Sequence, residues 1–268
     1  MDSVVDTESD YWLKLARHSP LGIVSDLDGT LLPFAATPDE ARPTPAIREL
    51  LAAMAALRGV TLIIASGRPQ ETLEEFFPLP RDFLLVAEHG AWRSSGQGWE
   101  STLSLDREAI ASLAWRLSDL RQKYPAALLE RKTWSLALHS RGVPTQDKRP
   151  FLVQASAVID PWLRAHPDFE LLSGNEVIEV RPRAARKATA ITWARTLMGP
   201  TCRLVVVGDD TTDEDMFVAA SSEDATILVG ADPRRTSAAR WRLGSPREVH
   251  AFYRRIISIR REGTHGPR

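Results

Sequence analysis

Short apolar runs alternate with amphipathic helical stretches along this chain, and that alternation limits its fold more than any other feature. Runs at residues 21–26, 60–65 and 83–87 each lead into a turn that contains glycine. The stretch between the first two runs begins at Pro45 and repeats apolar residues at helical spacing, namely Ile47, Leu50, Leu51, Met54 and Leu57. Strand, helix and strand in this order predict a parallel sheet with right-handed crossovers.

The pattern changes between about residues 96 and 174 and then resumes. Within that stretch we expect helices at 106–123 and 147–164 and two strands between 128 and 139. After it we expect further core elements, at 186–198 (helix), 203–207 (strand), from about 213 (helix) and 226–229 (strand). The prediction is an α/β fold with a Rossmann-like parallel-sheet core, residues 1–100 and 178–268, and an inserted α/β cap domain, residues 101–177. The last eight residues are expected to fray.

Composition excludes several classes of function. The chain has 268 residues, 43% of them hydrophobic and 26% charged, with a net charge of −1, so it offers no basic footprint for nucleic acid or an anionic membrane. Its single cysteine, Cys202, cannot form an internal disulfide. We find no secretory signal in the first twenty residues and no apolar run of membrane-spanning length. We therefore expect a cytoplasmic monomer without nucleic-acid or membrane partners.

Carboxylates gather where the core strands end. Asp26 and Asp28 follow the first strand, and Asp209 and Asp213 follow the run at 203–207. Because ligands bind at the carboxyl edge of an open α/β sheet, these side chains should converge on one site. Their mutual repulsion calls for a hard divalent cation, and Mg²⁺ suits a few carboxylates plus a phosphate.

Phosphate-binding groups are expected at the same edge. Ser66 and Gly67 offer a hydroxyl and a flexible turn after the second strand, and Lys187 offers a positive charge. Carboxylates, Mg²⁺, hydroxyl and lysine together predict phosphoryl transfer through a carboxylate nucleophile.

Four motifs in order, DLDGT at 26–30, SGR at 66–68, Lys187 and GDDTTDED at 208–215, resemble those of haloacid dehalogenase phosphatases. The resemblance implies Asp26 as nucleophile and Asp28 as the acid and base. It places Ser66 and Lys187 on the phosphate. It implies a Mg²⁺ site at Asp26, Asp28, Asp209 and Asp213, with Asp213 acting through water. The pumping branch of the superfamily has threonine where this chain has Asp28, which favours phosphoester hydrolysis.

Within that superfamily the chain resembles the trehalose-6-phosphate phosphatases from about residue 21 to residue 255. The segments that carry this are SDLDGTLLPF, IIASGRP, LVAEHGAW, LERKTWSLALHSR, GNEVIEVRP and GDDTTDEDMF. The resemblance implies that Glu130, Lys132 and Glu179 of the cap bind sugar hydroxyls. Two departures from the family pattern are Asn175, where lysine is usual, and Ser140, where tyrosine is usual.

Several of these residues have plainer interpretations. Asp210, Glu214 and Asp215 fit a helix N-terminus without metal, and Asp210 is a weaker ligand candidate than Asp209. Glu130 and Lys132 could form ion pairs across strands. The segment Glu88, His89 and Gly90 could be a turn, although its place at the functional edge favours contact with substrate.

Two other functions stay open at this point. The first is a phosphatase for a different sugar phosphate, such as sucrose 6-phosphate or a glycosyl-glycerate phosphate, which Asn175 favours because it supplies no charge. The second is a non-catalytic phosphosugar sensor, against which Asp28 argues, since binding alone needs no acid or base.

Overall fold

The computed structural model describes residues 3–35, 40–79, 81–106, 108–174, 176–232 and 234–264. The chain divides into a larger unit, residues 1–102 and 186–268, and a smaller unit, residues 103–185. The second boundary lies later than residue 177, where the sequence analysis placed it. The reason is that β10 (Val177–Pro182) pairs with β8 (Leu136–His139) and β9 (Phe169–Gly174), so it belongs to the smaller sheet.

The larger unit contains a nine-stranded sheet in the order β1-β13-β12-β11-β2-β3-β4-β5-β6. Its strands are β1 (Ser3–Val4), β13 (Trp241–Leu243), β12 (Ala225–Val229), β11 (Arg203–Gly208), β2 (Leu21–Ser25), β3 (Val60–Ala65), β4 (Leu84–Ala87), β5 (Trp92–Ser94) and β6 (Glu100–Ser101). Neighbours from β1 to β4 are parallel, and β5 and β6 continue the sheet antiparallel. The predicted α/β fold with a parallel-sheet core is confirmed.

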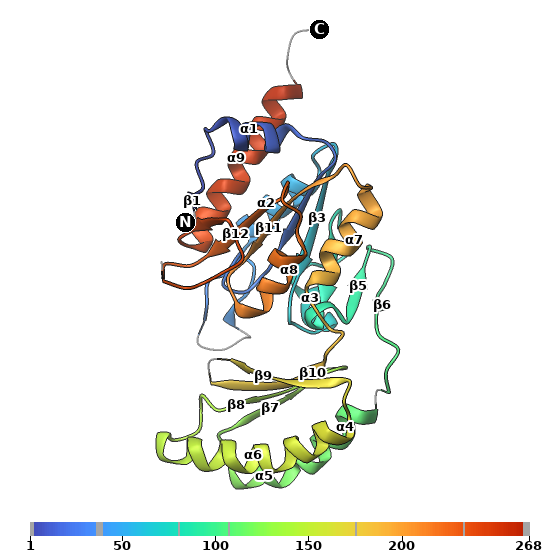
Figure 1. The fold of residues 1–268 in the computed structure, drawn as a ribbon, viewed down its shortest axis with the longest axis vertical. Helices are drawn as coiled ribbons and strands as arrows, with labels where there is room; N and C mark the ends of the chain where they lie inside the picture. The colour runs from blue at the N-terminus through green and yellow to red at the C-terminus, as the bar shows by residue number, and fades with distance from the viewer. Residues whose placement is uncertain are drawn as a thin grey trace. The chain divides into compact units, whose positions relative to one another are not determined.

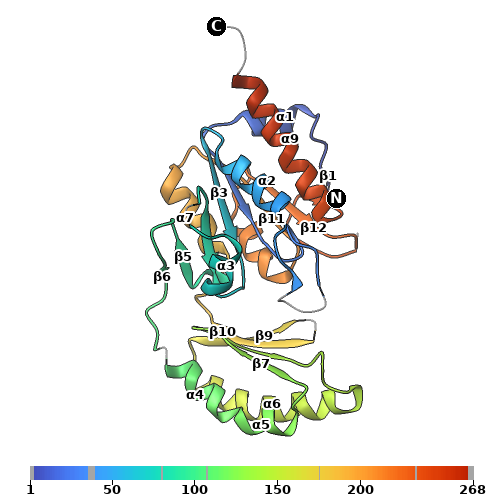
Figure 2. The ribbon, with the colours of Figure 1, turned by 180° about the vertical axis from the view of Figure 1, so that it is seen from behind.

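Helices cover both faces of this sheet (Figures 1 and 2). On one face α2 (Pro45–Ala55) and α1 (Asp10–Arg17) both contact α9 (Pro246–Thr264), and on the other α7 (Ala188–Met198) contacts α8 (Glu214–Ala219). A further helix, α3 (Gln70–Phe76), contacts β4. Helix α2 begins at the predicted proline, where Thr44 Oγ1 accepts a hydrogen bond from the amide of Ile47 at 3.4 Å. Its predicted apolar stripe is buried at Ile47, Leu50, Leu51 and Met54.

The smaller unit has an antiparallel sheet in the order β7-β8-β10-β9, where β7 is Leu128–Arg131. Its helices are α4 (Glu108–Arg116), α5 (Ser118–Lys123) and α6 (Thr145–Ala165). Leu113, Phe151 and Ile159 from these helices share a buried core with Leu138 and Val180 of the sheet. One face of the sheet therefore packs against this core. The residues that alternate with the core residues along each strand lie on the opposite face.

Three expectations about local structure were wrong. The helix expected at 106–123 is divided into α4 and α5 at Leu117, whose φ of −95° and ψ of 3° are not helical. Of the tail expected to fray from residue 261, the part that the structure describes is helical as far as Thr264, and Ser258 Oγ donates to Glu262 at 2.8 Å within this stretch. Strands β9 and β10 were not expected at all.

Candidate active site

Asp26 and Asp209 lie side by side because they follow adjacent parallel strands. Ser25, the last residue of β2, pairs with Val207 of β11, and the amide of Asp26 donates to the carbonyl oxygen of Val207 at 2.8 Å. This register brings the residues after both strands to the same edge of the sheet. Thr30 Oγ1 also donates to Asp209 Oδ1 at 2.9 Å, which fixes the orientation of that carboxylate.

Asp213 is turned back toward the strand end that precedes it. It closes the short 3₁₀ helix η3 (Thr211–Asp213), and its Oδ2 accepts hydrogen bonds from the amides of Asp209 and Asp210, each at 2.9 Å. A Cβ atom on Gly208 would lie 2.5 Å from Cβ of Asp213, so only glycine allows this approach. Asp210 itself is exposed, in keeping with its lower rank as a ligand candidate.

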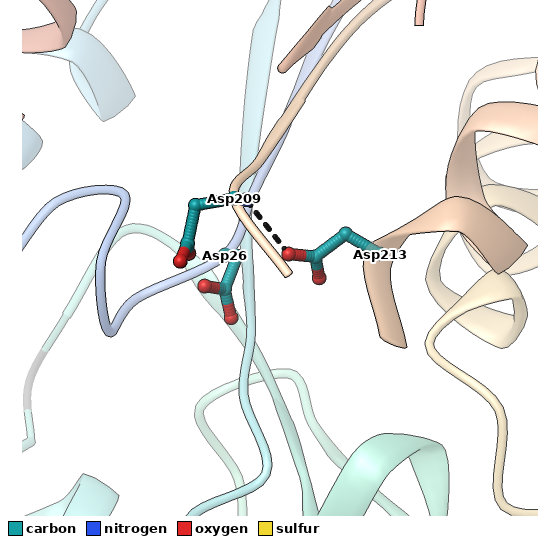
Figure 3. A group of neighbouring side chains, drawn as sticks. All are labelled: Asp26, Asp209 and Asp213. Atoms are coloured by element: carbon teal, nitrogen blue, oxygen red, sulfur yellow. Dashed lines mark hydrogen bonds between the residues drawn. The ribbon is translucent and has the colours of Figure 1, made fainter. Parts of the chain in front are cut away.

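The three aspartates form one buried group (Figure 3). Asp26, Asp209 and Asp213 each offer an oxygen within 4.8 Å of the others, and their exposed fractions are 3%, 6% and 0%. A buried cluster of carboxylates is costly unless cations compensate for the charge.

Lys187 supplies one compensating charge. It precedes α7, and its Nζ donates to Asp26 Oδ1 at 2.5 Å and to Asp213 Oδ1 at 2.7 Å. Burial lowers the pKa of Lys187, but the carboxylates of Asp213 and Asp26 outweigh it, and the net pKa is raised above its ordinary value. The lysine is therefore positively charged at neutral pH.

The negative charge of the cluster still exceeds that of one lysine. Burial, followed by repulsion from Asp213, raises the pKa of Asp26 well above its usual range, although Lys187 opposes the shift. The same two causes raise the pKa of Asp209 to about 6. Three carboxylates and one lysine leave a charge of −2 when all are ionised, and the donors are all oxygens. This donor set fits a hard divalent cation.

Asp28 faces away from this group and forms a two-pronged ion pair. Arg68 donates from Nε to Asp28 Oδ2 and from Nη2 to Asp28 Oδ1, both at 2.7 Å. The guanidinium is held in turn by the carbonyl oxygen of Ala41 at 3.2 Å and by the ring of Phe76, whose centroid lies 4.9 Å away. The described acidic cluster does not include Asp28. The sequence analysis gave no role to Arg68 of the SGR motif. Its positive charge follows the strand next to the one that Asp26 and Asp28 follow, and this was a usable signal.

Ser66 and the turn after β4 lie against each other. Ser66 is buried, and its Oγ accepts a hydrogen bond from the amide of Arg68 at 3.1 Å. The next loop passes through Glu88, His89 and Gly90, whose φ values of 45°, 57° and 109° are all left-handed. The amide of His89 donates to the carbonyl oxygen of Ser66 at 3.0 Å.

Gly67 admits the ring of His89. A Cβ atom at Gly67 would fall 2.5 Å from Cε1 and Nε2 of that ring. Two consecutive non-glycine residues in the left-handed region cost roughly 1–3 kcal/mol each, and such strain concentrates at functional sites. The predicted residues of the larger unit are thus brought together at one edge of its sheet.

The cap candidates belong to the smaller unit and share the face of its sheet opposite the apolar core. The register places Glu130 and Glu179 on either side of Ala137 in one row. Lys132 Nζ donates to Glu179 Oε1 at 2.9 Å, and Ser135 Oγ donates to the same oxygen at 2.5 Å. The structure thus forms ion pairs across strands.

Glu130 pairs with a histidine. His139 Nε2 lies 3.0 Å from Glu130 Oε2, and this hydrogen bond lowers the pKa of Glu130 more than burial raises it. Sequence reasoning missed the roles of Ser135 and His139, since both depend on strand register. Asn175 lies outside the described residues.

Among the helices of the described ranges, none combines the length and apolar character needed to cross a membrane.

Residues 24–247 match the family model described as trehalose-phosphatase. A bifunctional trehalose-6-phosphate synthase/phosphatase from Thermoproteus tenax is 30% identical over 87% of this chain, which spans 31% of that protein. The chain thus covers about a third of the length of that relative. A probable trehalose-phosphate phosphatase from Sinorhizobium fredii is 30% identical over 80% of this chain and 76% of its own length.

The fold has a solved counterpart. The C-terminal domain of C. albicans trehalose-6-phosphate phosphatase superimposes with a TM-score of 0.81 at 21% identity, covering 96% of this chain and 98% of that one. At this identity the likeness concerns the fold alone.

Proposed function

This chain belongs to the trehalose-phosphatase family, and from that premise we propose that it hydrolyses trehalose 6-phosphate to trehalose and phosphate as the last step of trehalose biosynthesis. The protein is a phosphatase that hydrolyses a phosphate monoester. The observation that carries the proposal is the double contact of Lys187 with Asp26 and Asp213 inside a buried acidic group. A site that only binds sugar has no use for such an arrangement.

We assign the nucleophile to Asp26. Its carboxylate attacks phosphorus, the bond from phosphorus to the sugar oxygen breaks, and an aspartyl-phosphate forms. Asp28 gives its proton to the leaving sugar oxygen and then takes a proton from the water that attacks the aspartyl-phosphate, which releases phosphate and restores Asp26. Lys187 and the hydroxyl of Ser66 hold the transferring phosphoryl oxygens.

The cation that fits this donor set is Mg²⁺, which Asp26 and Asp209 would hold, with Asp213 supporting it through water. When bound, Mg²⁺ neutralises negative charge on the transferring phosphoryl group. Before phosphate enters, Lys187 and Thr30 keep the carboxylates oriented for it. In this structure both oxygens of Asp28 accept hydrogen bonds from Arg68, so one of them must be released and protonated before Asp28 acts as the acid. We place Asp28 in acid and base catalysis and not on the metal.

The smaller unit supplies specificity in this proposal. Its sheet face presents Glu130, Lys132, Ser135 and Glu179 as hydrogen-bonding groups for neutral sugar hydroxyls. Glu88, His89 and Gly90 would contact substrate from the larger unit. A cytoplasmic location and a monomeric state stay predictions.

The proposal is tested by phosphate release with Mg²⁺ from trehalose 6-phosphate, sucrose 6-phosphate, glucose 6-phosphate and mannose 6-phosphate. The account expects a preference for trehalose 6-phosphate that Asp26→Asn abolishes. Preference for another sugar phosphate would keep the aspartate chemistry and move the substrate assignment. Sugar-phosphate binding without release would favour the sensor.

A further inference from the structure

The larger unit has a cavity that lies far from the acidic cluster. It has a volume of about 880 Å³ and is bounded by the last turn of α1, the end of α2 and the last turns of α9. Ser19 and Arg58, which line it, stand just before β2 and β3, whereas Asp26 and Ser66 follow the other ends of these strands. The cavity therefore opens at the amino edge of the sheet, roughly 20 Å of strand away from the catalytic edge.

The charged groups that line this cavity are all arginines, and they come from two helices, α1 and α9, and from the turn after α2. They are Arg17, Arg58, Arg260 and Arg261, and no carboxylate is among the described lining residues. The rest of the lining is mostly apolar, with Ala53, Ala56, Leu57 and Ile259. We call this set the arginine cavity. Residues far apart in sequence thus bring like charges to one cavity, and the positive potential that they share attracts anions.

One of the four arginines has a structural role. Arg260 donates from Nη1 to the carbonyl oxygens of Ala16 and His18 and from Nη2 to that of Arg58, each at 2.7 Å. These bonds join α9 to the end of α1 and to the turn before β3. Burial lowers the pKa of Arg260.

Helix dipoles explain only part of the remaining charge. Helices α1, α2 and α9 end at this cavity, and each C-terminus carries roughly half a negative charge. The three ends together carry less negative charge than Arg17 and Arg58 carry positive charge. Arg17 and Arg58 are exposed, and neither forms an ion pair with any carboxylate of the described residues. An excess of positive charge is left facing the hollow.

We propose that the arginine cavity binds a small organic phosphate, with its phosphate on Arg17 and Arg58 and its less polar part against Leu57 and Ile259. The planar guanidinium matches phosphate with two parallel hydrogen bonds. A volume of about 880 Å³ is that of a metabolite-sized site. The proposal does not depend on the catalytic chemistry, because no residue of the acidic cluster lines this cavity.

The test is calorimetric titration of the full chain, without divalent cations, with inorganic phosphate, glucose 6-phosphate and ATP as probes. We compare the wild type with Arg17→Ala/Arg58→Ala. The matched control is Arg121→Ala/Arg164→Ala, which removes two exposed arginines from the smaller unit. Since all the substituted side chains are exposed, the variants should fold, and thermal unfolding checks this. A second variant, Arg17→Gln/Arg58→Gln, keeps the side chains polar.

At least one organic phosphate should bind, with affinity reduced about tenfold or more in both cavity variants and unchanged in the control. Binding equally weakened in the control would show general charge attraction and overturn the proposal. So would equal affinity in all variants, which would place the probe elsewhere. Failure of every probe to bind would also overturn it. If a poly-glutamate peptide bound instead, the cavity would be assigned to an acidic protein segment.

Discussion

The two polar regions of this protein handle charge in opposite ways. The acidic cluster of the larger unit sets three carboxylates against one lysine and keeps a negative excess in a buried place. The polar sheet face of the smaller unit pairs Lys132 with Glu179 and Arg181 with Glu170, and Glu130 is hydrogen-bonded to His139. An uncompensated site is built to receive a cation, and a matched one to exchange hydrogen bonds with a neutral polyol.

The largest expected effect comes from removing the lysine that partly neutralises the acidic cluster. Lys187→Met should lower phosphate release on the order of 10³-fold, because it removes a preorganised charge from the transferring group. Loss of one partner from a buried ion pair should also destabilise the metal-free protein by ~3 kcal/mol. Steady-state kinetics and urea unfolding in chelator measure these two effects. Lys148→Met, which breaks a more exposed ion pair with Glu176 in the smaller unit, is the control and should leave the unfolding free energy much closer to wild type.

The pH dependence of stability tests the same negative excess without mutation. The folded protein holds protons on Asp26 and Asp209 more tightly than the unfolded chain does, since both pKa values are raised, that of Asp209 from 3.8 to about 6. Metal-free stability should therefore fall as pH rises from about 4 to above 6, by ~3 kcal/mol for Asp209. The raised pKa of Lys187 contributes stability that is constant below about pH 10.5 and is lost only above it, so it does not affect this range.

Magnesium should reverse that loss. Thermal unfolding with and without Mg²⁺ should show greater stabilisation at pH 7.5 than at pH 5, because protons compete with the cation for the same carboxylates. Glu130 and Glu176 have lowered pKa values, so their contribution to protein stability is lost only below about pH 4.5. They do not affect the comparison between pH 5 and pH 7.5. Equal stabilisation by Mg²⁺ at both pH values would contradict the assignment of the metal site.

A smaller effect should distinguish the role of Asp28 from the role of the acidic cluster. Arg68→Ala removes the pair that positions Asp28, so hydrolysis of a sugar phosphate should fall about 100-fold. Hydrolysis of p-nitrophenyl phosphate should fall far less, because its leaving group departs as p-nitrophenolate and needs no proton from Asp28. Arg42→Ala is matched, since Arg42 also lies over the Phe76 ring but pairs with Glu75. Equal losses with both substrates would mean that Arg68 acts only on structure.

The smallest expected effect on activity comes from a substitution on the polar sheet face of the smaller unit. Glu179→Gln keeps the shape of the side chain but removes its charge and weakens its bonds with Lys132 and Ser135. We expect KM for trehalose 6-phosphate to rise about tenfold, with hydrolysis of p-nitrophenyl phosphate nearly unchanged. Steady-state kinetics on both substrates would decide, and a matching loss on the small substrate would place Glu179 outside sugar recognition.

The sequence predicted the acidic cluster because its geometry depends on strand ends. Asp26 and Asp209 follow apolar runs that can only be central strands, so their meeting follows from parallel pairing. The pair of Asp28 with Arg68 depends on how two loops forty positions apart fold onto each other. The partner of Glu130 depends on strand register. The arginine cavity joins residues 17, 58 and 261, which no local pattern connects.

The most direct test of the account is chemical capture of the phosphorylated nucleophile. Asp28→Asn should slow hydrolysis of the aspartyl-phosphate, so that the intermediate accumulates when trehalose 6-phosphate and Mg²⁺ are added. Borohydride reduction of the acid-quenched protein, followed by peptide mass analysis, should then find Asp26 converted to homoserine. Conversion of another carboxylate, or none in a variant that still releases a first equivalent of trehalose, would contradict Asp26 as the nucleophile.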